Sequence, residues 1–450
     1  MFSRYLELLR LPGALNFSIF GLFGRFPTSM MGISTILMVR LLYGNYTLAG
    51  IISATNTIAY AMGALVLAKL VDRFGQARVM LPSITVSLAA MVATVVCALM
   101  LVPPMVVGVL MAVAGATSGS IGALARTRWP RLVPSPLQIQ TAYALEAAID
   151  EFCFVIGPVL ATIAATAVHP VGGLVLLIVF FAVGGYGFLA QRATEPEPIR
   201  RVARSAAARA TADEAGTATK TQRRAMVAAA AASSPAADDV SAQAHPKVRV
   251  FTPLLAMLAV TYMGAGLVFG VNDISVVAFA DEQGYTSLSG VLLAVMSAGS
   301  LVAALVYGAR NWRIPMWKRF IIGVVLLAVG VTTFFFATNM VIMAVVLLLT
   351  GLTLAPTMTN TNTIIEMVTP KEYLTESLTW MSTAMCVGIS LGSALAGGPV
   401  DSHGSHAGFL LVIGAGWLMV LLALVGLRLV KRETVRASER RHEHVEAATR

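Results

Sequence analysis

Charged residues are scarce in this chain of 450 residues: Asp, Glu, Lys and Arg make up 12% of it, whereas 57% of the residues are hydrophobic. Soluble globular domains carry about 25% charged residues, so this composition argues against a water-soluble enzyme. The formal net charge of +10 would indicate nucleic-acid binding if the basic residues formed a stripe on a polar domain, which they do not. We therefore expect no nucleic acid among the partners of this protein.

The sequence also lacks motifs for nucleotide or metal chemistry. It contains neither G-x(4)-G-K-(S/T) nor a G-x-G-x-x-G after a strand, and no H-E-x-x-H, so we expect no ATP-driven step, no metal site and no enzyme activity. The three cysteines, Cys97, Cys153 and Cys386, fall within apolar runs and are interpreted as small apolar residues. Any energy would then come from an ion gradient, for which we expect protons, or from the substrate's own gradient, without a bound cofactor.

Long runs without charge define the class of the protein. Residues 79–125, 152–191 and 320–365 contain no Asp, Glu, Lys or Arg, and each is long enough for two crossings of a bilayer, since one crossing needs about 20 apolar residues. The remaining crossings are expected at 41–68, 283–309, 377–400 and 402–427, and in charged segments that start near Asn16, Ala142 and Thr252. The sequence therefore predicts an all-α integral membrane protein with about twelve transmembrane helices in a lipid bilayer.

The basic residues predict the orientation. With a cytoplasmic N-terminus, all of the 32 Lys and Arg residues except Arg25 and Arg40 belong to cytoplasmic segments or their edges. By the positive-inside rule, we expect a multi-pass protein of the cell membrane with both termini in the cytoplasm. The apolar stretch after Arg10 is too long for a signal peptide and has no A-x-A site, so the first helix is expected to stay as an anchor.

Two six-helix halves are expected, over residues 1–191 and 251–430. The segment between them, 192–250, is rich in Ala with scattered Arg, Thr and Ser, which favours a cytoplasmic, largely disordered linker. A surface helix around 222–232 is the alternative. A basic cytoplasmic tail is expected over 431–450.

An internal repeat supports the division into halves. YGNYTLAGIISA, ending at Ala54, aligns with EQGYTSLSGVLLA, ending at Ala294, and pairs Gly50 with Gly290. At a nearly equal offset, FVIGPVLA aligns with ISLGSALA and pairs Gly157 with Gly392. The matches join the second helix to the eighth and the fifth to the eleventh, as expected of duplicated halves in the same orientation.

A motif follows the second predicted helix. The segment AKLVDRFGQARVM resembles the signature loop of the major facilitator superfamily, G-x-L-a-D-R-x-G-R-(K/R), with Ala68 in place of the first Gly. The resemblance implies a twelve-helix secondary transporter of a drug-efflux-like type. It also implies a conformational latch in the outward-facing state, formed by Asp72, Arg73, Gly75 and Arg78; the alternative is that these arginines only set the topology.

Three carboxylates lie in the predicted fifth helix, at Glu146, Asp150 and Glu151. Ionised side chains in a membrane are costly and seldom face lipid, so the cluster is a functional hypothesis. Glu146 and Asp150 share a helix face, which suits reversible proton binding, although Glu146 is close enough to the start of the helix to reach cytoplasmic water. Static ion pairs that hold the bundle together are the alternative.

Arg25 in the first span is the expected counterpart, because a buried guanidinium needs a carboxylate or an anionic substrate. The resemblance implies that it faces Asp150 or Glu151 in a charged central cavity, with Asp273 and Asn272 of the seventh helix on the other side.

Two further groups of candidates lie on other helices. Asn360 and Asn362, in the polar run APTMTNTNTIIEM, are expected to line the substrate cavity if the tenth helix faces it. The pair Gly157 and Pro158 resembles the centre of the antiporter motif of the fifth helix, and a helix bend that permits close packing explains it equally well.

Together these features predict a monomeric secondary transporter that exports small or amphipathic molecules in exchange for protons. Two alternatives stay open. One is a proton-linked importer of sugars or organic acids, in which Arg25 binds the anion. The other is a scaffold or receptor that transports nothing, in which the acidic residues form static pairs.

Overall fold

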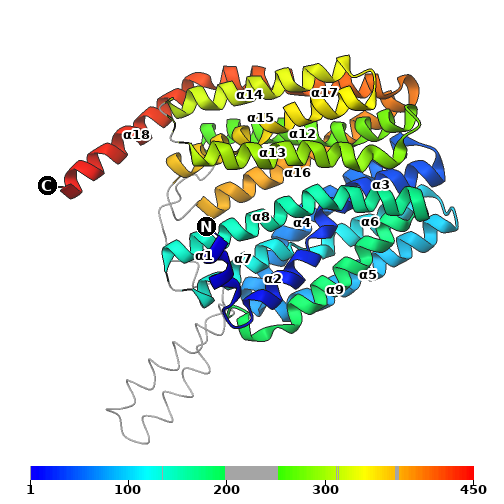
Figure 1. The fold of residues 1–450 in the computed structure, drawn as a ribbon, viewed down its shortest axis with the longest axis horizontal. Helices are drawn as coiled ribbons and strands as arrows, with labels where there is room; N and C mark the ends of the chain where they lie inside the picture. The colour runs from blue at the N-terminus through cyan, green and yellow to red at the C-terminus, as the bar shows by residue number, and fades with distance from the viewer. Residues whose placement is uncertain are drawn as a thin grey trace, which may run out of the picture.

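The computed structural model describes residues 2–133, 135–197, 252–310, 312, 314–369 and 374–449, and the regular elements among them are all helices (Figure 1). Twelve segments of these helices are long and apolar enough to span a membrane. The prediction of an all-α membrane protein with about twelve spans is therefore confirmed. Most of the predicted linker, from residue 198 on, and its alternative helix at 222–232 lie outside the described residues.

The first half begins with a short helix, α1 (Phe2–Leu9), followed by six spans. These are α2 (Ala14–Phe23) with α3 (Phe26–Tyr43), α4 (Tyr46–Phe74), α5 (Gln76–Leu99), α6 (Pro104–Ser118) with α7 (Ile121–Leu132), α8 (Pro136–Ile163) with the π-helical turn η1 (Ala164–Val168), and α9 (Gly172–Ala190). The break between α6 and α7 needs a glycine, because Gly119 has φ +62° and a Cβ there would collide with Met80.

The second half repeats this plan. Its spans are α12 (Pro253–Glu282), η3 (Thr286–Leu288) with α13 (Ser289–Ala309), α14 (Met316–Thr332) with η4 (Thr333–Phe336), α15 (Met340–Val368), α16 (Leu374–His403) and α17 (Ser405–Val425). The predicted basic tail is part of a further helix, α18 (Leu427–Thr449). Figure 1 shows that both chain termini lie at one end of the bundle, which we call the terminal end; the other is the far end.

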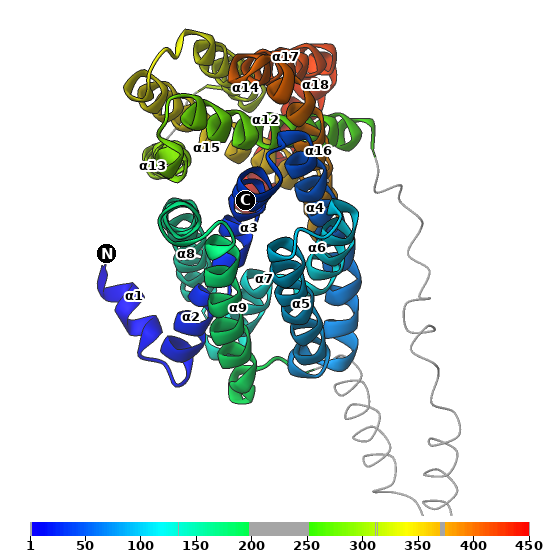
Figure 2. The same cartoon turned by 90° about the vertical axis from the view of Figure 1, so that its right-hand side faces the viewer.

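The two halves form separate groups of helices that meet where α16 lies beside α4 and α13 beside α8 (Figure 2). These two pairs are equivalent under the sequence repeat. The repeated glycines explain the close approach, since a Cβ on Gly50 of α4 would collide with the Ser393 carbonyl of α16, and one on Gly290 of α13 with the Pro158 carbonyl of α8. The repeat therefore marks the symmetric junction between the halves.

The other repeated pair of glycines packs helices within each half. A Cβ on Gly157 of α8 would collide with the Ser29 hydroxyl of α3, and one on Gly392 of α16 with the Leu267 carbonyl of α12. Close packing is thus one role of Gly157, as the sequence analysis allowed.

Polar contacts join the halves at the far end. Nε and Nη2 of Arg40, on α3, lie 3.2 and 3.1 Å from Oδ2 of Asp281, on α12. The carboxylate of Asp401, near the end of α16, accepts hydrogen bonds from the N–H groups of Tyr46 and Thr47 at 2.8 and 2.7 Å. It sits at the N-terminus of α4, where a helix favours negative charge. The far end is therefore closed by contacts between the halves.

Candidate functional site

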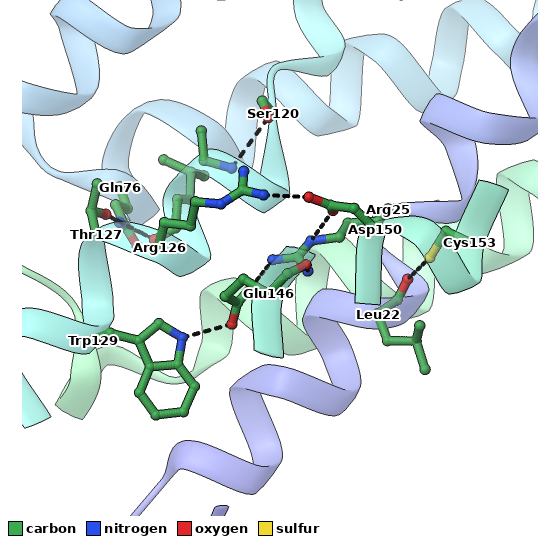
Figure 3. Close-up of polar contacts among 12 residues, drawn as sticks. Leu22, Arg25, Gln76, Ser120, Arg126, Thr127, Trp129, Glu146, Asp150 and Cys153 are labelled. Carbon is green, nitrogen blue, oxygen red and sulfur yellow. Dashed lines mark hydrogen bonds and ion pairs between the residues drawn. The ribbon is translucent and has the colours of Figure 1, made fainter. Parts of the chain in front are cut away.

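Arg25 sits at a break in the first span, between α2 and α3, and Pro27 lies in the first turn of α3. Its side chain is 3% exposed, and its Nη2 forms an ion pair with Oε2 of Glu146 on α8 (Figure 3). Nε lies 3.4 Å from Oδ1 of Asp150, one turn further along α8. The structure thus brings Arg25 together with two of the three predicted carboxylates.

Glu146 is sealed inside the first half. Its side chain is fully buried, and while one oxygen pairs with Arg25, the other accepts a hydrogen bond of 2.6 Å from Nε1 of Trp129 on α7. The idea that Glu146 reaches cytoplasmic water is therefore wrong for this conformation, because Arg25 and Trp129 occupy both of its oxygens. This part of the cluster resembles the static pair that the sequence left as an alternative.

Asp150 is the carboxylate that two arginines share. Beside its contact with Arg25, its Oδ2 forms an ion pair with Nη2 of Arg126 on α7. Asp150 is 32% and Arg126 40% exposed, whereas Glu146 is fully buried. Gly122 leaves room for the group, since a Cβ there would lie 3.1 Å from Nε of Arg25. Asp150 therefore combines two cationic neighbours with access for a proton.

Glu151 lies on a different face of α8. It is about 100° from Asp150 around the helix, on the side of Pro158 and Thr162, which contact α13 at Gly290. The side chain is partly buried and forms no ion pair with the described residues. Glu151 thus faces the second half and not Arg25.

Asp273 and Asn272 come from α12, on the other side of the junction. Oδ2 of Asp273 lies 3.8 Å from the position of a Cβ on Gly32 of α3, so this carboxylate faces the first half. Asn272 is 1% exposed, its Nδ2 lies 3.8 Å from Sδ of Met296 on α13, and its Oδ1 has no hydrogen-bond partner among the residues that the structure describes. Asp273 forms no ion pair within the described part of the chain.

The asparagines of α15 hold helices of the second half together. Oδ1 of Asn360 accepts a hydrogen bond of 2.6 Å from Tyr307, and its Nδ2 donates one of 3.0 Å to the Arg319 carbonyl. Oδ1 of Asn362 accepts a hydrogen bond of 2.5 Å from Tyr262. These bonds use the polar atoms of Asn360 in packing, and a substrate role for the two amides stays a prediction.

The predicted latch residues lie at the terminal end, where α4 turns into α5. Gly75 has φ +97°, which favours glycine, and its N–H bonds to the Val71 carbonyl at 2.7 Å. Asp72, Arg73 and Arg78 are exposed. Asp72 forms no ion pair or hydrogen bond with other described residues, so the latch is not engaged in this conformation, and its role stays a prediction.

Sequence analysis missed a second arginine centre at the terminal end. Arg128 of α7 is fully buried, donates from Nε to Gln76 at 2.9 Å, and lies 3.7 Å above the ring of Phe188. Its Nη1 also bonds to Thr194 in the turn η2 (Arg192–Thr194). The folded half therefore extends past residue 191, into the first residues that the sequence assigned to the linker.

Two halves related by a repeat, twelve spans and charged groups within the membrane region are typical of a membrane transporter. The sequence profile of the Major Facilitator Superfamily matches residues 17–320 and, in a second match, residues 254–449. The chain belongs to this superfamily. The family expected from the signature loop is therefore confirmed, and it indicates a transporter rather than an enzyme.

Solved transporters share the fold at low sequence identity. The nucleoside transporter NupG is 11% identical in a mutant form, with a TM-score of 0.66 over 91% of this chain and 98% of its own. A mutant of a peptide transporter, POT, is 14% identical, with a TM-score of 0.65 over 95% and 96%. The xylose transporter XylE from E. coli is 14% identical, with a TM-score of 0.63 over 92% and 96%. No curated protein sequence matches the chain significantly.

Proposed function

We propose that this protein exports small or amphipathic molecules from the cytoplasm in exchange for protons. It would work as a monomer in the cell membrane, with both termini in the cytoplasm. The asymmetry of Lys and Arg supports this orientation, and the membership of the superfamily supports secondary transport.

The observation that carries the proton coupling is the pair of contacts made by Asp150. Protonation of this carboxylate would remove the charge that holds Arg126, while Arg25 would keep its partner Glu146. The contact between α7 and α8 then depends on whether a proton is bound. A partly exposed ion pair such as Arg126–Asp150 is weak, so a proton can displace Arg126 from Asp150. The buried pair of Arg25 with Glu146 stays intact.

The same geometry favours export over the import of organic acids. Arg25 is buried and faces two carboxylates, so it offers no free guanidinium to an anionic substrate. Glu151 and Asp273, in contrast, face the junction between the halves. A carboxylate there holds one positive charge at a time, either a proton or a cationic group, and that competition is the basis of an exchange.

The closed far end fits one state of the proposed cycle. With the termini in the cytoplasm, the contacts of Arg40 with Asp281 and of Asp401 with α4 would close the extracellular side. Asp72 would engage only when the cycle closes the cytoplasmic side, which agrees with a latch for the outward-facing state.

Everted membrane vesicles test the proposal. Respiration acidifies their lumen, and a substrate of a proton exchanger then raises the luminal pH when it is added outside. We expect substrates found in a screen of small molecules to alkalinise vesicles that contain the wild-type protein and not those with Asp150→Asn. Glu433→Gln is the matched control and should behave as wild type, because Glu433 is partly exposed and its ion pairs lie within α18. Substrate accumulation with unchanged luminal pH, or full proton movement in Asp150→Asn, would refute the proposed coupling.

A further inference from the structure

The charges in the membrane region do not balance where the halves meet. Arg25 and Arg126 are partners of Glu146 and Asp150 inside the first half. Two further carboxylates, Glu151 and Asp273, form no ion pair with the described residues and face the junction from opposite halves. An uncompensated carboxylate is costly at this depth, so the junction favours a positively charged occupant.

Asn272 provides an independent indication of the occupant. It directly precedes Asp273 on α12, its side chain is 1% exposed, and its Oδ1 has no hydrogen-bond donor among the described residues. Buried amide oxygens nearly always accept a hydrogen bond, and one without a donor is destabilising. The neighbouring atom on α13, Sδ of Met296, is at most a weak acceptor for the amide nitrogen and donates nothing.

Asp273 and Asn272 thus place a carboxylate and an amide oxygen on neighbouring residues of α12. Within the described part of the chain, no donor bonds to Oδ1 of Asn272 and no cation pairs with Asp273. Gly32, on the facing helix α3, has no side chain to cover the carboxylate. A cation with N–H groups fits this arrangement, since it would form a charge-assisted hydrogen bond to Asp273 and a second bond to Asn272. Metal cations fit less well, because they need more oxygen ligands than these two side chains offer.

We infer that Asp273 and Asn272 bind the ammonium group of the substrate, and that the exported molecules are protonated organic amines. The inference rests on the proposed transport function and adds the chemical class of the substrate. The apolar part of the amine would lie toward Met296, whose flexible thioether adapts to different shapes. Glu151, on the opposite half, adds negative charge to the path. Because a protonated carboxyl group attracts an ammonium group only weakly, amine binding should weaken as the pH falls.

Binding to the purified full-length protein in detergent, with no gradient, tests this inference separately from transport. The probe is 1-adamantylamine, measured by equilibrium dialysis against protein-free micelles. Three analogues keep its shape: 1-adamantanol is neutral, adamantane-1-carboxylate is an anion, and N,N,N-trimethyl-1-adamantylammonium keeps the charge but has no N–H.

We expect saturable binding of 1-adamantylamine and at least tenfold weaker binding of the alcohol and the carboxylate. Asp273→Asn should weaken amine binding at least tenfold, and Asp273→Glu should restore most of it. Asn272→Leu should weaken binding of the amine severalfold and leave the trimethyl analogue, which cannot donate to Oδ1, nearly unchanged. Glu433→Gln should bind as wild type.

Several results would overturn the inference: no saturable binding of the amine to the wild type, equal binding of the alcohol, or unchanged binding in Asp273→Asn. If Asp273→Asn fails to fold, as judged by gel filtration, the comparison of the four probes on the wild type still decides. If the amine binds as expected but moves no protons in everted vesicles, the proposed coupling fails and the amine site stands. If only uncharged or anionic substrates drive proton movement, the proposed coupling stands and the amine site fails.

Discussion

Adding one methyl group at the junction between the halves should bias the conformational cycle. In Gly50→Ala the new Cβ would overlap the Ser393 carbonyl, and in Gly290→Ala it would overlap the Pro158 carbonyl. Backbone atoms cannot move aside as a side chain can, and overpacking of this kind costs about 1–3 kcal/mol. If the cost falls on the state with the far end closed, the equilibrium shifts by about 5–150-fold toward the state with the far end open.

Distances between two spin labels at the far end would measure this shift. Cysteines introduced at Met105 of α6 and Val341 of α15 suit the labels, because both residues are exposed and lie in different halves. The three native cysteines would first be replaced by serine. We expect a longer distance to gain population in Gly50→Ala and in Gly290→Ala, and more in the double variant.

Two controls separate this effect from a general loss of stability. Gly414 of α17 has open space around its Cβ position, so Gly414→Ala should leave the distances unchanged. Gly157→Ala packs against Ser29 within the first half, so it should lower stability without favouring the longer distance. Unchanged distances in both junction variants, with the protein folded, would refute the assignment of these glycines to the closed far end.

Three further predictions follow from single residues. Glu146→Gln leaves Arg25 buried without its closest charge partner and should cost about 3–5 kcal/mol of unfolding free energy, seen as a lower Tm in detergent. Glu433→Gln, at a partly exposed position of α18, should change Tm little, and equal Tm values for the two variants would contradict the buried pair. Asp401→Asn removes the charged acceptor at the start of α4, where each hydrogen bond to a charged group contributes about 1.5–3 kcal/mol to stability. The spin-label distance at the far end should therefore lengthen, and a distance that stays short would contradict the role of Asp401 in closing that end. Arg128→Met frees the segment at Thr194, so hydrogen exchange of the end of α9 should become faster, and an unchanged rate would contradict the tie between α7 and η2.

The sequence predicts the fold well because membrane spans leave a strong signal. Charge-free runs give most of the twelve spans, and the repeat pairs Gly50 with Gly290 before their contacts are known. The repeat does not tell which residue of the other half each glycine contacts. That information depends on how two halves pack, which no local pattern specifies.

The candidate site is predicted only in part. The cost of charge in the membrane singles out Arg25 and the three carboxylates of the fifth helix as candidates. The resemblance implied Asp150 or Glu151 as the partner of Arg25, whereas in the structure Arg25 pairs with Glu146 and lies near Asp150. The sequence does not single out Arg126 and Trp129 as site residues. They lie in the run RTRWPR, whose arginines are already explained by the positive-inside rule. The sequence also does not show which way Glu151 points. It follows Asp150 by one position on the helix, and that single step turns its side chain toward the other half.

Exchange in proteoliposomes with and without a pH gradient tests the central claim most directly. If Asp150 couples transport to protons, Asp150→Asn should still exchange labelled for unlabelled substrate across the membrane, yet a pH gradient should no longer drive accumulation. Accumulation in Asp150→Asn at the wild-type level would contradict the account, because the proton would then be carried by another group.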